Sequence, residues 1–195
     1  SNEKRTRTIL VTSAVGSEGK TTLAINLALA FAAMGKRTLL IDSDLRLPSV
    51  AKVFGVEDHD GPLVDVLLGE KDLAQSLVET RFPNLQLLVC GKPPSNPAEL
   101  LGSHQFKALH TSLARRFDRI VFDSPPTVPV TDAQLLCPYA DDVVLVIRQD
   151  TSERHAVQHA LRQLRDVNAP LAGCVFNGAD ARGVGYGYGY GYKYG

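Results

Sequence analysis

Short apolar runs rich in Val, Ile and Leu recur along the chain. They occupy residues 9–11, 38–41, 85–89, 120–122, 143–147 and 171–176. Most of these runs do not alternate polar with apolar residues, which is typical of strands buried on both faces in a parallel sheet. We therefore predict six strands at these positions, most of them in the interior of a largely parallel sheet.

Longer segments between the runs show the spacing of helices. Apolar residues recur every three or four positions in residues 106–117 and again in residues 157–167. An Ala/Leu-rich run at 23–33 ends just before Gly35, which is a suitable helix stop. Strands that alternate with helices predict an α/β fold, with helices on both faces of the central sheet.

Two further segments do not follow this strand–helix alternation. Residues 55–83 are interpreted as a mostly helical elaboration of the same domain, with helices at 63–68 and 73–78. The prolines of residues 91–97 predict a rigid loop. We divide the chain into a residual linker at 1–7, one catalytic domain at 8–179 and a flexible tail at 180–195. A length of 195 residues fits one domain.

Composition excludes several classes of protein. Lys and Arg number 21, Asp and Glu also 21, so the chain lacks the excess of positive charge expected of a nucleic-acid-binding protein. No apolar stretch approaches the roughly 20 residues of a membrane span, and no signal peptide opens the sequence. Cys90, Cys137 and Cys174 are scattered without metal-ligand spacing, which predicts buried or half-buried thiols in a reducing compartment.

Residues 14–22 carry the strongest chemical signal, directly after the first predicted strand. They read Ala-Val-Gly-Ser-Glu-Gly-Lys-Thr-Thr and match the phosphate-loop pattern G-x-x-x-x-G-K-[ST], with Ala14 in place of its first glycine. Backbone N–H groups of such a loop bind phosphate at a helix N-terminus. We predict that Lys20 bridges the β- and γ-phosphates and that Thr21 offers its hydroxyl to Mg²⁺. The predicted nucleotide-binding residues here are Gly16, Ser17, Glu18, Gly19, Lys20, Thr21 and Thr22.

Carboxylates follow two other predicted strands. Asp42 and Asp44 come directly after residues 38–41, and Asp123 ends the run at 120–122. Open α/β sheets bind ligands where their strands end. Asp42 or Asp44 is therefore predicted to coordinate Mg²⁺ through water or to accept a proton, and Asp123 to orient the metal.

Weaker signals leave alternatives open. Asn177, at the end of the last strand, either reads an adenine edge or forms a turn before Gly178. Arg46 either places charge near the phosphates or bonds an acid locally, and Asp132 either has a functional role or caps a helix. His155 and His159 lie four residues apart among polar residues, which favours a solvated helix face.

The end of the chain differs in composition from the rest. Five tyrosines alternate there with Gly or Lys: Tyr186, Tyr188, Tyr190, Tyr192 and Tyr194. Alternating glycine costs too much backbone entropy for a stable strand. We predict a flexible, exposed tail.

These motifs, in this order, resemble the cytoplasmic catalytic domain of the bacterial protein tyrosine kinases (BY-kinases) of exopolysaccharide export. The resemblance covers nearly the whole chain. It rests on the phosphate loop, Ile-Asp-Ser-Asp-Leu-Arg at 41–46, Val-Phe-Asp-Ser-Pro-Pro at 121–126 and the terminal tyrosine cluster; residues 93–101 also resemble a P-P-N-P-x-E-L-L stretch of that family. It implies a three-layer P-loop NTPase fold of the deviant Walker A (SIMIBI-like) class.

The resemblance also implies roles and partners. Lys20 and Thr21 would bind ATP or ADP with Mg²⁺, Asp42 and Asp123 would hold the hydrated metal, and Asp44 would position or deprotonate the incoming tyrosine; Asp42 and Asp44 could exchange roles. The phosphoacceptors would be the tail tyrosines of a neighbouring subunit in a ring. The expected partner is a membrane polysaccharide co-polymerase region, in the same chain or separate, at the cytoplasmic face of the bacterial inner membrane.

Three departures and three alternatives accompany this resemblance. Gly16 stands where many relatives have Pro, residues 1–7 do not match the family's E-x-x-R-x-x-R motif, and no membrane segment is present. We interpret the chain as a domain excised from a larger protein. A switch ATPase of the same class remains an alternative, although many such ATPases carry a lysine where this chain has Val15. A non-catalytic scaffold and a self-associating Gly/Tyr tail are the others.

Overall fold

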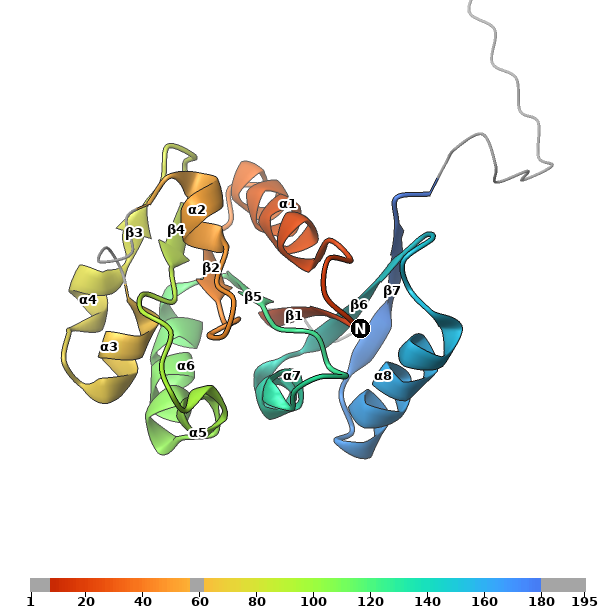
Figure 1. The fold of residues 1–195 in the computed structure, drawn as a ribbon. Helices are drawn as coiled ribbons and strands as arrows, with labels where there is room; N and C mark the ends of the chain where they lie inside the picture. The colour runs from red at the N-terminus through yellow and green to blue at the C-terminus, as the bar shows by residue number, and fades with distance from the viewer. Residues whose placement is uncertain (1–7, 57–61, 180–195) are drawn as a thin grey trace, which may run out of the picture.

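A seven-stranded sheet runs through residues 8–56 and 62–179, the part of the chain that the computed structural model describes (Figure 1). The strand order is β3-β4-β2-β5-β1-β6-β7. Within the described residues all neighbouring strands are parallel except β3 and β4. The strands are β1 (Thr8–Ser13), β2 (Thr38–Asp42), β3 (Val78–Glu79), β4 (Leu85–Leu88), β5 (Arg119–Asp123), β6 (Asp142–Arg148) and β7 (Leu171–Asn177).

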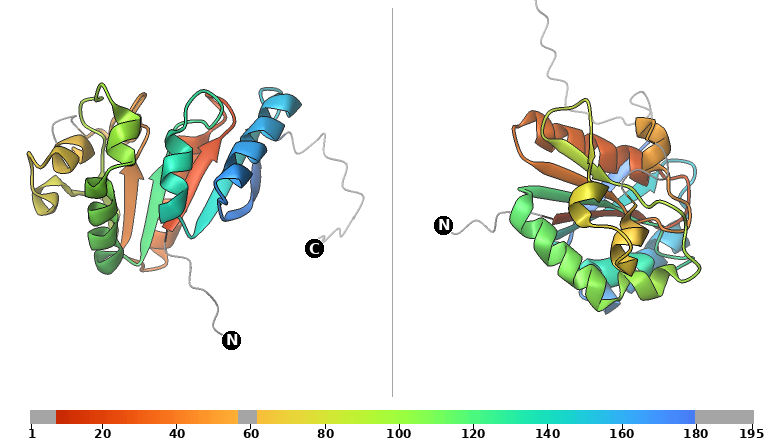
Figure 2. Two further views of the ribbon diagram at one scale, coloured as in Figure 1. Left: turned by 90° about the horizontal axis from the view of Figure 1, so that it is seen from below. Right: turned by 90° about the vertical axis from the view of Figure 1, so that its left-hand side faces the viewer.

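Helices lie on both faces of this sheet (Figures 1 and 2). Helices α1 and α2 cover one face, whereas α6, α7 and α8 cover the other. Helices α3 and α5 pack against α6, and α5 also contacts α7. The helices are α1 (Lys20–Ala33), α2 (Val50–Phe54), α3 (Leu63–Leu68), α4 (Leu73–Ser76), α5 (Pro97–Leu101), α6 (His104–Arg116), α7 (Asp132–Leu136) and α8 (Arg154–Asp166), with a 3₁₀ turn at Cys137–Tyr139.

The central strands bury side chains on both faces, as their unbroken apolar runs predict. In β1, Ile9 and Val11 pack into the apolar cluster under α1, while Leu10 joins the cluster on the opposite face. Strand β5 divides in the same way, with Val121 on the α1 side and Phe122 on the other. The mostly parallel α/β sheet and its three layers are confirmed.

Strand β7 departs from this pattern. It lies at the sheet edge, beside β6 alone, and Val175 and Phe176 are 37% and 57% exposed. Cys174 on the same strand is exposed, which corrects the prediction of a shielded thiol, whereas Cys90 and Cys137 are buried. The apolar run at 171–176 is a strand, but its composition does not distinguish an interior strand from an edge strand.

The segment predicted as a helix at 73–78 is the other correction. Helix α4 ends at Ser76, and Val78–Glu79 form β3, in which Val78 pairs with Leu87 of β4. Pairing with a strand nearby in the sequence overrides the helical spacing of these residues. The helices predicted within 23–33, 63–68, 106–117 and 157–167 are present.

Parallel strands place their carboxyl ends at one edge of the sheet. The loops after β1, β2 and β5 therefore meet there, and the β2–β5 register pairs Asp42 with Asp123. The crevice beyond such carboxyl ends is the usual ligand site of open α/β sheets. The predicted linker 1–7 and tail 180–195 lie outside the described residues.

Candidate active site

The loop between β1 and α1 has the backbone of a phosphate cradle. Gly19 precedes α1 with φ = +98°, in the left-handed region that favours glycine. A Cβ atom at this position would lie 2.2 Å from Nδ2 of Asn177. Both the dihedral angle and the close approach of Asn177 therefore require glycine here, as the motif predicts.

Glu18 lies inside this loop with its side chain fully buried. Its Oε2 accepts a hydrogen bond from the backbone N–H of Val15 at 2.9 Å, and its Oε1 accepts one from the hydroxyl of Ser152. The carboxylate thus fixes the curvature of the loop. Of Glu18, only the backbone is left for the predicted contact with nucleotide, because its side chain is buried in the protein.

Residues from the far end of the chain brace the loop from outside. Arg148 Nη1 donates to the carbonyl of Ser17 at 3.0 Å, and Asn177 Nδ2 donates to the carbonyl of Glu18 at 3.0 Å. Sequence reasoning missed Arg148 and Ser152. Each lies more than 130 positions from its partner in the loop, so no local spacing could reveal the contact.

Thr21 and Asp123 come together as the motif predicts. The Thr21 hydroxyl donates to Oδ2 of Asp123 at 2.6 Å, while Oδ1 of Asp123 is buried and has no hydrogen-bond partner among the described residues. A hydroxyl beside a carboxylate with a vacant oxygen fits Mg²⁺, which is held by one or two carboxylates together with phosphate and water. The described residues contain no cluster of three or more His, Cys, Asp or Glu suited to a metal.

Asp42 is fully buried and is held by backbone donors. Its Oδ2 accepts hydrogen bonds from the N–H groups of Ser49 and Val50, both at 2.9 Å, and its Oδ1 accepts one from Asp44 at 3.3 Å. Burial, with the nearby charge of Asp123, raises the pKa of Asp42 to about 7. Because its hydrogen bonds reach backbone N–H groups at both ends of the loop between β2 and α2, the Asp42 carboxylate holds the conformation of that loop.

Asp44 and Asp123 share the same crevice. Asp44 is 8% exposed, and its Oδ1 accepts the N–H of Leu47 at 3.0 Å. Burial raises the pKa of Asp123 to about 6, although the hydrogen bond from Thr21 and the charge of Lys20 oppose the shift. The site thus holds more negative charge than Lys20 balances, which favours a bound cation.

Unpaired polar atoms mark the same edge. The buried hydroxyls of Ser43, after β2, and Thr127, after β5, lack hydrogen-bond partners within the described part of the chain, as does Oδ1 of Asp123. Buried polar atoms are rarely left unpaired. Among the described residues the fourth such atom is Oε1 of Gln163 on α8. The other three lie at the carboxyl ends of β2 and β5, which is typical of a site that a polar ligand completes.

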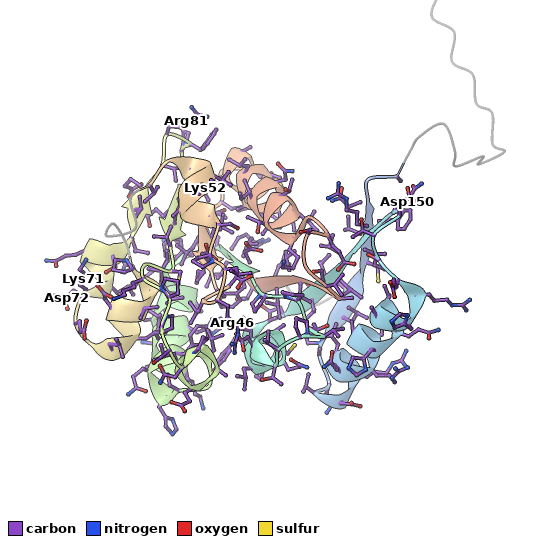
Figure 3. All side chains as sticks on the ribbon, viewed as in Figure 1. Arg46, Lys52, Lys71, Asp72, Arg81 and Asp150 are labelled. Atoms are coloured by element: carbon purple, nitrogen blue, oxygen red, sulfur yellow. The ribbon has the colours of Figure 1, made fainter. Side chains whose placement is uncertain are left out.

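Arg46 and Asp132 form a bidentate ion pair that closes one side of the crevice. Nε of Arg46 donates to Oδ2 of Asp132 at 2.8 Å, and an Nη donates to Oδ1 at 3.0 Å. Figure 3 shows Arg46 between the loop after β2 and α7. Arg46 thus bonds an acid, 86 positions away in sequence. Asp132 is the first residue of α7, with Thr131 as the N-cap.

The remaining candidates are placed as follows. Oδ1 of Asn177 accepts the N–H of Gly178 at 2.9 Å, which is the predicted turn, while its amide nitrogen lies against the phosphate loop. Thr22 is exposed on the first turn of α1. His155 and His159 are exposed on α8, as predicted, and His155 pairs with Glu153 at 3.2 Å.

This fold and site define a P-loop nucleotide-binding protein, and comparisons with known proteins narrow the class. A family model described as an AAA domain matches residues 6–172. Tyrosine-protein kinase YwqD of Bacillus subtilis is 39% identical over 90% of this chain and 74% of its own length. The chain therefore belongs to the AAA-domain family and, within it, to the bacterial tyrosine-protein kinases.

Solved structures agree with this assignment. The kinase domain of Escherichia coli tyrosine kinase ETK superposes with a TM-score of 0.87 at 26% identity, over 97% of this chain and 74% of that one. The septum site-determining protein MinD of Pyrococcus horikoshii, complexed with Mg-ADP, gives a TM-score of 0.74 at 26% identity, over 90% and 72%. The predicted fold class is thus confirmed. None of the helices in the described residues is long and apolar enough to span a membrane.

Proposed function

We propose that this domain is an ATP-dependent tyrosine autokinase that phosphorylates the tyrosines of residues 186–194 in a neighbouring copy. The observation that carries the proposal is the pair of Thr21 and Asp123 at the phosphate loop, where Oδ1 of Asp123 is buried without a hydrogen-bond partner among the described residues. Membership of the bacterial tyrosine-protein kinase family supports the reaction. The Gly/Tyr segment supplies the acceptor in the same chain.

Nucleotide binding is assigned to the loop and the residues that brace it. Lys20 and the N–H groups of residues 16–22 would bind the phosphates, and Asn177, beside Glu18, would contact the base through its second amide hydrogen. Thr21 and Asp123 would hold Mg²⁺, with Asp42 reaching it through water. When bound, Mg²⁺ neutralises charge on the β- and γ-phosphates. Arg46 would affect phosphate binding indirectly, because its ion pair with Asp132 fixes the loop after β2 next to the site.

Phosphoryl transfer then needs positioning and a proton acceptor. The phenolic oxygen forms a bond to the γ-phosphorus while the bond to the β,γ-bridging oxygen breaks, and ADP leaves. Tyrosine hydroxyls have a pKa near 10 in peptides, so the proton must pass to a base during transfer. We assign this base to Asp44, because three backbone N–H groups already occupy Asp42.

The biological setting follows from the family. We infer that the kinase regulates exopolysaccharide or capsule polymerisation and export at the cytoplasmic face of the bacterial inner membrane. A membrane co-polymerase region, in the same chain or separate, would bring copies together in a ring. A Lys20→Met substitution in the producing cell should change the amount or chain length of the exported polysaccharide, and unchanged polysaccharide would contradict this role.

The experiment that tests the reaction is incubation of the purified protein with Mg²⁺-ATP, followed by intact mass and phosphotyrosine mapping. We expect phosphate on Tyr186 to Tyr194, and its loss in an Asp44→Asn variant. Release of ADP without phosphotyrosine, at concentrations that force encounters between copies, would instead support the switch-ATPase alternative.

A further inference from the structure

A pocket of about 480 Å³ opens at the edge of the sheet where the parallel strands begin, opposite the edge that carries the phosphate loop. Arg37 and Asn84, which line it, directly precede β2 and β4. The five residues of β2, at about 3.3 Å each, separate the two edges by roughly 16 Å. The volume lies in the range of small-ligand pockets, roughly 300–1,000 Å³, and no step proposed above uses it.

Three arginines line this pocket. Arg37 comes from the start of β2, and Arg115 and Arg116 lie in the last turn of α6. The helix dipole favours cations in a last turn, and α8 also has an arginine there, Arg165. Helix α6 differs because it contains no Asp or Glu. In addition, the side chains of Arg115 and Arg116 make no hydrogen bond or ion pair with any residue that the structure describes.

Backbone hydrogen bonds join the segments that form the pocket. The carbonyl of Arg37 accepts the N–H groups of Asp118 at 2.8 Å and Arg119 at 3.2 Å, which ties the start of β2 to the chain after α6. On the other side, the N–H of Thr38 donates to the carbonyl of Asn84 at 2.8 Å. The arginines are therefore attached to a fixed backbone.

Charge in the pocket is predominantly positive. Nε and Nη2 of Arg37 donate to Asp118 at 3.3 Å and 3.1 Å, which leaves three of the five N–H donors of this guanidinium. Glu79 is the one carboxylate among the lining residues, and its Oε1 accepts a hydrogen bond from Gln86. With Arg37 paired to Asp118, the two arginines of α6 still outnumber Glu79. The pocket thus favours an anionic ligand.

We propose that this pocket binds a phosphate monoester, and that its ligand is a phosphotyrosine of the Gly/Tyr segment. The inference rests on the proposed function and adds a site that holds the product of the reaction. A phosphotyrosine carries about −1.5 to −2 charge at pH 7 and three acceptor oxygens. Guanidinium groups bind phosphate through paired hydrogen bonds and recur in phosphopeptide-binding sites. Phe117, which also lines the pocket, and the aliphatic stems of the arginines would contact the tyrosine ring.

The shape of the pocket favours phosphotyrosine over two other sources of phosphate. Inorganic phosphate has no ring for Phe117 and the arginine stems to cover, and it would fill little of the cavity. A membrane surface presents its phosphates in a plane, whereas these arginines border a recess. The five tyrosines of residues 186–194 lie in the same chain, so the reaction would produce the ligand directly beside the pocket's own protein.

The test uses synthetic peptides, so that binding is measured independently of the kinase reaction. A fluorescein-labelled peptide of residues 183–195 is made with and without phosphate on Tyr188 and Tyr190. The full chain carries Lys20→Met to prevent transfer of phosphate, and binding is followed by fluorescence anisotropy. We expect the phosphopeptide to bind about tenfold or more tightly than the unphosphorylated peptide. Arg115→Gln/Arg116→Gln in the full chain should remove this difference.

A matched control separates the pocket from general attraction between charges. Arg162 and Arg165 are exposed on α8, as Arg115 and Arg116 are on α6, and they do not line the pocket. Arg162→Gln/Arg165→Gln changes the net charge by the same amount and should bind the phosphopeptide as the parent chain does. Equal melting temperatures of the two double variants would show that neither disturbs the fold.

The outcomes distinguish the possible failures. Equal binding of the two peptides would overturn the proposal, and so would equal binding of the phosphopeptide by the α6 and α8 variants. Inorganic phosphate that displaces the phosphopeptide as effectively as phenyl phosphate does would assign the pocket to free phosphate and overturn the role of the ring. Phosphatidylglycerol vesicles that bind the parent chain but not the α6 variant, without binding of the phosphopeptide, would assign these arginines to a membrane surface instead. Because the peptides are synthetic, failure of this assay would refute the pocket alone, and failure of the kinase assay above would refute the proposed function.

Discussion

Two aspartates flank the length of β5 and differ in their electrostatic state: Asp118 directly precedes the strand and Asp123 ends it. At the amino end, the carboxylate of Asp118 accepts hydrogen bonds from the guanidinium and the backbone N–H of Arg37, and these bonds lower the pKa of Asp118 to about 2. At the carboxyl end, burial raises the pKa of Asp123 to about 6. The aspartate at one end is paired with an arginine, whereas Asp123 at the other end has a buried oxygen with no hydrogen-bond partner in the described part of the chain.

The arginine pairs at the two edges differ in the same sense. Arg37 and Asp118 are 62% and 37% exposed, so water screens their attraction. Arg46 is 39% exposed, but its partner Asp132 is fully buried and depends on the pair for both carboxylate oxygens. We infer that the Arg37–Asp118 pair at the amino ends of the strands contributes to stability in water. The Arg46–Asp132 pair at the carboxyl ends instead helps to hold a site in which several carboxylates are buried together.

Loss of the charge at the carboxyl end should have the largest effect. Asp123→Asn should lower the rate of phosphoryl transfer by about 10²–10³-fold, since it removes a group that would hold the metal. In chelator without nucleotide, the same variant should unfold at a higher temperature, because a buried carboxylate near Asp44 is gone. Asp118→Asn, immediately before the same strand, is the matched control. Activity within tenfold of wild type in Asp123→Asn would contradict the assignment.

Breaking the buried pair should have an intermediate effect. Arg46→Ala leaves Asp132 buried without its partner and should lower the free energy of unfolding by about 1–3 kcal/mol, measured by urea denaturation. The Arg46→Ala/Asp132→Ala double variant should recover part of this loss, because it also removes the buried carboxylate that Arg46→Ala leaves without its partner. Equal stability of Arg46→Ala and wild type would show that water already serves Asp132.

The exposed pair should give the smallest effect, visible only in acid. Because the pKa of Asp118 is lower in the folded protein than its usual value of 3.8, its contribution is complete above about pH 4 and is lost as the pH falls toward 2. Asp118→Asn should therefore reduce the difference in melting temperature between pH 6 and pH 3. Asp166→Asn, an exposed acid at the end of α8, should leave that difference unchanged.

Prediction from sequence succeeded where a residue's role depends on its neighbours in the chain. The loop at 14–22 was recognisable because its glycine, lysine and threonine follow an apolar run and begin a helix. Asp42 and Asp123 each end such a run, and parallel strands necessarily bring such ends to one edge. The proximity of Thr21 to Asp123 follows from these two facts and is present in the structure.

Prediction failed where a contact joins distant parts of the chain. The partner of Arg46 and the bracing of the loop by Arg148 and Ser152 have no local signature, because any of several polar residues could have reached those positions. The exposure of β7 was missed for a related reason: its apolar residues have the same composition as those of the interior strands.

The sequence by itself thus determined the α/β class, the phosphate loop, the order of the strand-end carboxylates and the presence of an acceptor-like tyrosine segment. These features are encoded in periodicity and in adjacent residues. Only the tertiary structure decided the strand order and the partner of each buried charge. Those depend on which surfaces pack together across more than a hundred residues, and the free energy of packing belongs to the assembled fold rather than to any one segment.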